Sequence, residues 1–326
     1  MQATLEKARK KVPPTHTHLA PAIVCIVALL LICLYSVFAI HRLIRSNAEP
    51  TVPFTLGTAY RNVTYCNAQT LDLFVPRTAA RPLPLAIFVH GGGMISGGKG
   101  YLSPVFLNPL ARAGFAVASL NYRLAAPRLN FRHAPTNQFP AQIEDVKCGI
   151  RYLRAHAPRY DVNRNEIFAF GTSYGGTLVA LAALTGDHSA FDVGPYPNTS
   201  STVSAAVDLF GPTDLTRFAP PPDWQHIVLG SNPSNLVLAS PVHYVTVNVP
   251  PILIVQGTAD TMVPESQSVE LYQRLIASGD QTQLVLVRNM GHMFAQVGSQ
   301  SIDPSLSQIA KDIVRWFERN RAGVLR

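Results

Sequence analysis

Short, nearly continuous apolar runs recur along residues 59–326, and amphipathic stretches lie between them. Runs of this kind are typical of strands that are buried on both faces of a parallel sheet. Six of them are predicted as strands: Pro84–His90, Phe115–Asn121, Glu166–Gly171, Ser204–Phe210, Pro251–Gly257 and Gln283–Val287. Alternation of strands and helices over about 250 residues predicts an α/β fold, with a mostly parallel central sheet flanked by helices.

Apolar residues at helical spacing place three helices in this alternation. Their apolar stripes are Phe139, Ile143, Val146, Ile150 and Leu153, then Val269, Tyr272 and Leu275, and finally Ile309, Ile313 and Trp316. Residues 211–244 break the alternation with consecutive prolines and only short helical pieces. We interpret this segment as a cap-like excursion over the strand ends, where α/β folds place their sites. Phe218 and Trp224 either line a pocket there or belong to the core.

The N-terminal part of the chain has a different pattern. Residues 19–40 are a run of 22 residues without a charge. As a helix rising about 1.5 Å per residue, the run is long enough for a hydrocarbon core of roughly 30 Å. It is predicted as a transmembrane or signal-anchor helix between a basic tail (1–18) and a linker (41–58). A cleavable signal peptide is the alternative, although signal peptides have shorter apolar cores of about 7–15 residues.

Basic residues flank this run unequally. Four Lys or Arg residues precede it within 12 positions, and two follow it closely. This bias predicts that the N-terminus is cytoplasmic and that the body lies on the extracytoplasmic side of the membrane. The signal-peptide alternative predicts secretion instead. Two glycosylation sequons, at Asn62 and Asn198, are compatible with export.

Composition excludes some function classes. With 47% hydrophobic and 14% charged residues the chain is too apolar for a disordered protein. The net charge of +8 suggests nucleic-acid binding, but residues 1–45 hold six basic side chains and one acid. The body is therefore nearly neutral, and neither nucleic acid nor an obligate protein partner is expected.

The spacings of the cysteine and histidine residues match no metal-binding motif. No HExxH, paired-histidine or CxxC pattern occurs, so neither a metal nor a cofactor is predicted. Cys66 and Cys148 could pair outside the cell, but no feature of the sequence brings them together. Free thiols are the favoured state of these two residues.

A G-x-S-x-G pattern, Gly171-Thr172-Ser173-Tyr174-Gly175, joins a predicted strand to the apolar stretch Thr177–Leu184. A strand-to-helix turn of this kind forces the serine into a strained backbone conformation, and the small glycines let strand and helix approach closely. The serine Oγ then lies at a helix N-terminus, where negative charge is favoured. By itself the pattern is also compatible with an ordinary N-cap serine.

Three glycines follow a strand-ending histidine in His90-Gly91-Gly92-Gly93. Consecutive glycines leave backbone N–H groups free to point at an oxyanion, and such donors contribute roughly 3–4 kcal/mol to transition-state stabilisation. A flexible turn and a phosphate-binding loop over residues 93–99 are the competing interpretations. The phosphate loop is disfavoured because Gly100 stands where a hydroxyl would bind Mg²⁺.

Two further polar residues follow the last predicted strands. Asp260 comes after the strand Pro251–Gly257, and His292 comes after Gln283–Val287. The order Ser173, Asp260, His292 is that of an α/β-hydrolase triad, each member on a loop after its own strand. Serine needs an imidazole to take its proton, and the carboxylate fixes the imidazole tautomer. Asp214, also after a strand, is the alternative acid.

Several motifs together resemble an α/β-hydrolase esterase, over residues 60–322. They are His90–Gly93, Gly97–Lys99, Asn121–Leu124, Phe139–Val146, Gly171–Gly176, Gly257–Pro264 and Gly291-His292. The likeness is to the feruloyl/acetyl esterase group related to hormone-sensitive-lipase-type carboxylesterases. It implies Ser173 as nucleophile, His292 as base and Asp260 as its partner. It also implies an oxyanion hole formed by the N–H groups of Gly92, Gly93 and Tyr174.

Two departures from the family pattern bear on function. Tyr174 stands where the family usually has alanine, and Ser173-Tyr174-Gly175-Gly176 is similar to prolyl oligopeptidase-type peptidases. The chain also has no room for the family's N-terminal helical cap. The expectation is a membrane-tethered serine carboxylesterase acting on small esters of short to medium acyl chains. An exopeptidase or amidase on the same triad, and a non-catalytic binding module, are the alternatives.

Overall fold

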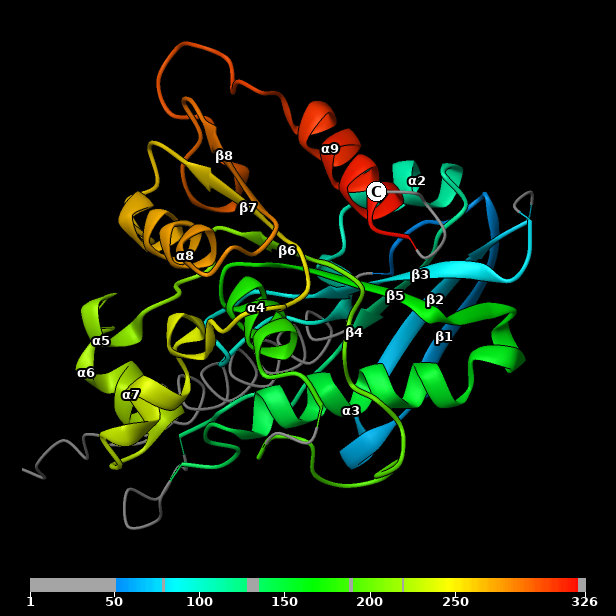
Figure 1. The fold of residues 1–326 in the computed structure, drawn as a ribbon, viewed down its shortest axis with the longest axis horizontal. Helices are drawn as coiled ribbons and strands as arrows, with labels where there is room; N and C mark the ends of the chain where they lie inside the picture. Colours follow the sequence, from blue (N-terminus) through cyan, green and yellow to red (C-terminus); the bar gives the residue numbers. More distant parts are fainter. Residues whose placement is uncertain (1–50, 78–79, 128–134, 188–189, 219, 322–326) are drawn as a thin grey trace, which may run out of the picture. The chain divides into compact units, whose positions relative to one another are not determined.

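The six predicted strands form the parallel part of one eight-stranded sheet in the computed structural model (Figure 1). The structure describes residues 51–77, 80–127, 135–187, 190–218 and 220–321. The strands are β1 (Gly57–Thr64), β2 (Thr70–Pro76), β3 (Leu83–Val89), β4 (Ala116–Leu120), β5 (Val162–Thr172), β6 (Ala206–Leu209), β7 (Ile252–Gly257) and β8 (Thr282–Val287). Their order in the sheet is β1-β2-β4-β3-β5-β6-β7-β8. The predicted α/β architecture is confirmed.

Strands β1 and β2 are antiparallel and were not predicted. β1 alternates between partly buried and exposed residues, as an edge strand does, and it begins at Gly57, inside the predicted linker. β2 is buried, but Asp72 interrupts its apolar run. That carboxylate is neutralised by Arg61 at 2.8 Å and by Lys99 at 3.4 Å. A charge inside a buried strand is compatible with the core only because both cations accompany it.

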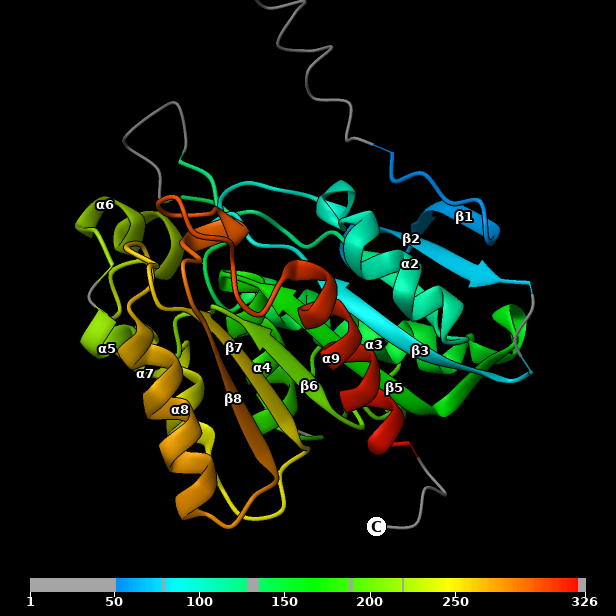
Figure 2. The same ribbon diagram turned by 90° about the horizontal axis from the view of Figure 1, so that it is seen from above.

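Helices cover both faces of the sheet. On one face lie α3 (Ala141–Ala155), α4 (Tyr174–Leu184) and α8 (Glu265–Ala277), and on the other lie α2 (Pro104–Arg112) and α9 (Leu306–Arg319). Figures 1 and 2 show α2 and α9 side by side. Alternate residues of β3 point to opposite faces, so that Leu85 and Ile87 join one core while Ala86 and Phe88 join the other.

Residues 211–244 consist of short helical segments grouped near α8 (Figure 2). These are α5 (Leu215–Phe218), α6 (Pro222–Trp224), a π-helical turn (Gln225–Leu229), α7 (Ser234–Leu238) and a 3₁₀ turn (Pro241–Tyr244). Phe218 and Trp224 are both half-buried and pack against the core on the α4 side of the sheet.

Cys66 and Cys148 form a disulfide, so the preference for free thiols was wrong. The turn between β1 and β2 lies on α3, where Asn67 Nδ2 donates to Asp145 Oδ1 at 2.7 Å. This contact between segments 82 residues apart brings the two Cα atoms to 6.2 Å. The pairing depends on the unpredicted strands β1 and β2, which is why the sequence pattern did not reveal it.

The predicted membrane helix (residues 19–40), the basic tail (1–18) and most of the linker lie outside the described residues. Within the ranges that the structure describes, no helix has the length and apolarity needed to cross a bilayer. The transmembrane interpretation therefore stays a prediction.

Candidate active site

The turn from β5 into α4 is made by one residue, Ser173. Its backbone has φ 53° and ψ −130°, a combination that a non-glycine residue adopts only under strain. The Ser173 N–H donates to the carbonyl of Leu209 at 2.8 Å, and its carbonyl accepts the N–H groups of Gly176 and Thr177. These bonds hold the strained conformation, as the G-x-S-x-G pattern predicted. Ser173 is consequently fixed between the end of the strand and the N-terminus of α4.

Glycine is required where strand and helix meet. A Cβ atom on Gly171 would lie 2.3 Å from the carbonyl oxygen of Gly175. A Cβ atom on Gly175 would lie 2.2 Å from the carbonyl oxygen of Val89, at the end of β3. Real Cβ atoms do not approach so closely, because van der Waals repulsion rises steeply at these distances. The glycines therefore bring the ends of β3, β5 and α4 together.

The structure joins the three predicted triad residues in one hydrogen-bonded relay. His292 Nε2 lies 3.0 Å from Ser173 Oγ, and His292 Nδ1 lies 2.7 Å from Asp260 Oδ2. A carboxylate only accepts, so Nδ1 carries the proton and Nε2 accepts from the serine hydroxyl. The imidazole is 8% exposed and the carboxylate is fully buried, so bulk water screens this relay poorly.

Asp260 is held by its own loop after β7. Its Oδ1 accepts the N–H groups of Met262 at 2.8 Å and Val263 at 2.9 Å, which leaves Oδ2 for His292. Burial alone would raise the pKa of Asp260, but the hydrogen bonds from His292, Val263 and Met262 outweigh it and lower the pKa below 3.8. Asp260 is therefore a carboxylate at neutral pH.

The alternative acid, Asp214, has a different role. Its Oδ1 accepts the N–H groups of Thr216 at 3.0 Å and Arg217 at 3.3 Å, at the beginning of α5. Its nearest histidine is His243, at 3.9 Å. Asp214 therefore caps a short helix, and the structure pairs His292 with Asp260 as the topology predicted.

The glycine loop after β3 lies against Ser173, since a Cβ atom on Gly91 would be 3.1 Å from the Cβ of Ser173. Hydrogen bonds fix the direction of two carbonyl groups in this loop, those of Gly91 and Gly92. The Gly91 carbonyl accepts from His90 Nδ1 at 2.7 Å and Tyr122 Oη at 3.3 Å. The Gly92 carbonyl accepts the N–H groups of Ile95 and Ser96 at 3.2 and 3.0 Å.

A trans peptide directs its N–H opposite to its C=O, so fixing each carbonyl also fixes the next N–H. The carbonyls of Gly91 and Gly92 thereby orient the N–H groups of Gly92 and Gly93. These two N–H groups and that of Tyr174, the first residue of α4, have no acceptor among the described residues. The structure thus brings the three predicted donors, unpaired, to the neighbourhood of Ser173.

Comparison with known proteins identifies the family. The BD-FAE family model matches residues 71–275, which is more than half of the chain and runs from β2 through β7. The chain belongs to the BD-FAE family. This confirms the resemblance to α/β-hydrolase esterases that the sequence motifs carried.

Individual relatives of this BD-FAE chain agree with the family assignment. Esterase LipC of Mycobacterium tuberculosis is 29% identical over 267 residues, 78% of this chain and 64% of LipC. The chain thus spans less than two thirds of that relative's length. A truncated carbohydrate esterase from gut microbiota superimposes with a TM-score of 0.69 and 28% identity, covering 83% of this chain and 99% of the other. Esterase 2 of Thermogutta terrifontis, phosphoramylated by tabun, gives a TM-score of 0.66 and 25% identity, covering 86% and 98%.

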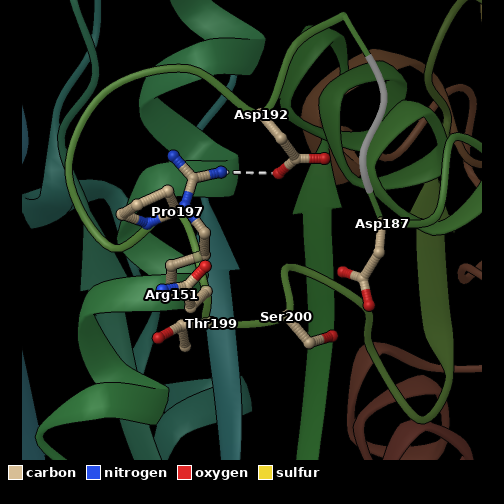
Figure 3. Close-up of a pocket in the computed structure, with 7 residues that line it drawn as sticks. Arg151, Asp187, Asp192, Pro197, Thr199 and Ser200 are labelled. Atoms are coloured by element: carbon tan, nitrogen blue, oxygen red, sulfur yellow. Dashed lines mark hydrogen bonds and ion pairs between the residues drawn. The ribbon is translucent and has the colours of Figure 1, made fainter.

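A separate polar hollow lies away from the triad, beside α3. It has a volume of about 660 Å³ and is lined by Arg151, Asp187, Asp192 and residues 197–200 (Figure 3). Arg151 Nη1 lies 2.5 Å from Asp192 Oδ1, and the Lys147 ammonium lies 3.0 Å from Asp192 Oδ2. Arg151 and Lys147 on α3 therefore bind Asp192 and hold the loop after α4 onto α3.

Two features of the site were missed in the sequence analysis. One is the set of groups that hold the glycine loop, in which Tyr122 stacks on the His90 ring at 4.2 Å. The motif Asn121–Leu124 marked Tyr122 without revealing this contact. The other is Asp208 at the end of β6, a fully buried carboxyl behind the serine turn. Asp208 lies in a predicted strand, and no sequence pattern marked it as part of the site.

Asp208 has an unusual environment for a carboxyl group. Its Oδ1 accepts the N–H of Gly211 at 2.8 Å, while Oδ2 has no hydrogen-bond partner among the described residues. A Cβ atom on Gly176 would lie 2.1 Å from Oδ1, so the carboxyl also fills the space beneath the first turn of α4. Burial, opposed only weakly by the Gly211 bond, raises the pKa of Asp208 from 3.8 to about 7.

This raised pKa predicts a specific pH dependence of stability. Between pH 4 and 7 the folded protein retains the Asp208 proton that the unfolded chain releases, so the free energy of unfolding falls as pH rises, by at most about 1.4 kcal/mol per pH unit. Asp208→Asn keeps the acceptor for Gly211 and removes the titration. Denaturant unfolding at pH 4.5 and 7.5 should therefore show a smaller loss of stability in the variant. An equal loss in both proteins would contradict this assignment.

Proposed function

We propose that this protein is a serine carboxylesterase that hydrolyses small-molecule carboxylic esters through an acyl-enzyme. The observation that carries the proposal is the relay from Asp260 through His292 to Ser173, with both hydrogen bonds at 3.0 Å or less. Membership of the BD-FAE family and the esterase names of its relatives support the same chemistry.

In the proposed mechanism, Ser173 Oγ attacks the ester carbonyl carbon while His292 Nε2 takes the hydroxyl proton. Asp260, a carboxylate at neutral pH, stabilises the imidazolium that forms and keeps Nδ1 protonated. The tetrahedral intermediate then expels the alkoxide, which receives the proton from Nε2. A water molecule repeats the sequence on the acyl-enzyme and releases the carboxylic acid and free Ser173.

The N–H groups of Gly92, Gly93 and Tyr174 are the proposed oxyanion hole. These three N–H groups have no acceptor among the described residues, and the carbonyl groups of Gly91 and Gly92 are held by hydrogen bonds. Donors fixed before the reaction stabilise developing charge without reorganisation, which is worth roughly 3–4 kcal/mol per donor. Tyr174 also lies at the N-terminus of α4, where the helix dipole adds to this stabilisation.

Short to medium acyl chains are the proposed substrates, and amide bonds are the second candidate. Tyr174, in place of the alanine usual in the family, is the residue that favours the amidase alternative. Both reactions use the same triad, so only relative rates on matched substrates separate them. An intact relay and unpaired donors disfavour the non-catalytic alternative, since neither is needed by a binding module.

A p-nitrophenyl ester series from C2 to C12 tests the proposal on the full chain in detergent. We expect hydrolysis that peaks at C2–C6 and exceeds that of a matched aminoacyl p-nitroanilide in kcat/KM. Ser173→Ala and His292→Ala should each lower kcat by several orders of magnitude, because each removes a group that acts in the transition state. Unchanged melting temperatures provide the control for folding. Near-normal turnover by either variant would refute the triad, and a higher kcat/KM for the anilide would favour the amidase.

We further propose that the chain is anchored in a membrane through residues 19–40, with the catalytic domain on the extracytoplasmic side. The charge-free run and the excess of basic residues before it support this topology. The disulfide between Cys66 and Cys148 supports it independently, because such bonds persist mainly in oxidising compartments.

Carbonate extraction of membranes that carry the full chain tests the anchor. We expect the intact chain to stay in the membrane pellet, and we expect Cys66 and Cys148 to resist alkylation unless a reductant is added. A shortened chain in the soluble fraction would show that residues 19–40 are a cleaved signal peptide. Full-length chain in that fraction would refute both membrane interpretations.

A further inference from the structure

The carbonyl of Gly93 is held by a residue from a distant segment. Trp224 Nε1 donates to the Gly93 carbonyl oxygen at 2.6 Å, although the two residues are 131 positions apart. A Cβ atom on Gly93 would lie 3.4 Å from the same indole nitrogen, so the ring edge is in contact with this peptide. Trp224 therefore completes the set of donors that hold the loop, after His90 and Tyr122 on Gly91 and the N–H groups of Ile95 and Ser96 on Gly92.

The same indole also contacts the third proposed oxyanion donor. The ring centroids of Trp224 and Tyr174 are 4.7 Å apart, with the planes inclined by 31°. Tyr174 is only 8% exposed, so its ring is confined between Trp224 and the core. One side chain from residues 211–244 thus touches both segments that provide the unpaired N–H groups.

Trp224 is itself fixed in place by the π-helical turn that follows it. The Phe139 N–H donates to the Val228 carbonyl at 2.7 Å, and Gln138 Nε2 donates to the His226 carbonyl at 2.8 Å. These bonds tie residues 225–229 to the beginning of α3. π-Helical turns are rare and occur frequently at functional sites. The turn therefore presents the indole to the glycine loop from a rigid support.

From these contacts we infer that Trp224 is a positioning residue for the oxyanion hole, which rests on the proposed esterase function. Gly93 has φ 66°, a conformation that glycine can leave easily. The peptide planes on either side of its Cα are fixed by the Ile95 and Ser96 donors on one side and by the indole on the other. Without the indole N–H, the second plane, which carries the Gly93 carbonyl and the Met94 N–H, is free to rotate about the Gly93 Cα–C bond, so the turn that carries the Gly93 N–H loses one of its two supports. The segment 211–244 thereby affects catalysis through the contact of Trp224 with the glycine loop, without contacting the reacting atoms.

The chain offers a matched pair of tryptophan variants. Trp224→Phe removes the indole N–H and keeps an aromatic ring against Tyr174. Trp316→Phe, in α9, removes an indole N–H that has no hydrogen-bond partner among the described residues. Trp224 and Trp316 are the chain's two tryptophans, so both variants change a Trp to a Phe, and only the first affects the loop.

Two measurements on the full chain test the inference. Hydrogen–deuterium exchange of peptides covering residues 90–97 should accelerate in Trp224→Phe and stay at the wild-type rate in Trp316→Phe. With p-nitrophenyl acetate, Trp224→Phe should lose about tenfold in kcat with KM within twofold of wild type, since the lost interaction acts in the transition state. Trp316→Phe should keep both constants.

The outcomes separate this inference from the proposed function. Wild-type exchange rates in Trp224→Phe would overturn the inference, as would faster exchange with unchanged kcat. A raised KM at constant kcat would also overturn it, because it would make Trp224 a substrate contact only. If the wild type hydrolyses no ester or anilide, the esterase proposal fails. Faster exchange in Trp224→Phe would in that case still show that Trp224 holds the glycine loop in place.

Discussion

The strained turn at Ser173 is the constraint on which the rest of this structure depends. A strand and a helix reverse direction through one residue with positive φ, so the surrounding backbone must pack without side chains at Gly171 and Gly175. Every residue of α4 is buried, which gives the helix a fixed place against β5 and β6. The contacts of the whole domain thus maintain a conformation that costs free energy locally. This conformation places the Ser173 hydroxyl at the carboxyl ends of the parallel strands, where the loops after β3, β7 and β8 meet.

Two buried carboxyl groups near this turn show how environment divides their roles. Asp260 accepts hydrogen bonds from His292 and from two backbone N–H groups and has a lowered pKa, so it stays charged beside His292. Asp208 accepts one backbone N–H, its second oxygen has no partner in the part of the chain that the structure describes, and its pKa is raised. The first carboxyl serves the chemistry by its charge. The second fills space beneath the serine turn and is tolerated because it can be neutral.

Sequence patterns predicted the parts of the molecule that local chemistry determines. Continuous apolar runs identified β3 to β8 because strands buried on both faces need them, and the glycine patterns identified the turn at Ser173 and the loop at Gly91–Gly93. The edge strand β1 was not predicted because half of its residues face solvent. Strand β2 was not predicted because Asp72 interrupts its apolar run, and the cations that neutralise this charge are distant in the sequence. The Cys66–Cys148 disulfide and the bond from Trp224 to Gly93 link segments 82 and 131 residues apart. No local pattern contains such pairings, since the fold creates them.

Covalent labelling by an organophosphate shows whether Ser173 is an activated nucleophile. The full chain is treated with diethyl p-nitrophenyl phosphate, and intact mass and peptide mapping are then recorded. We expect one diethylphosphoryl group per chain, located on Ser173, and no modification when His292 is replaced by alanine under the same conditions. A folded wild-type chain that stays unmodified, or that carries the label on another residue, would contradict the account.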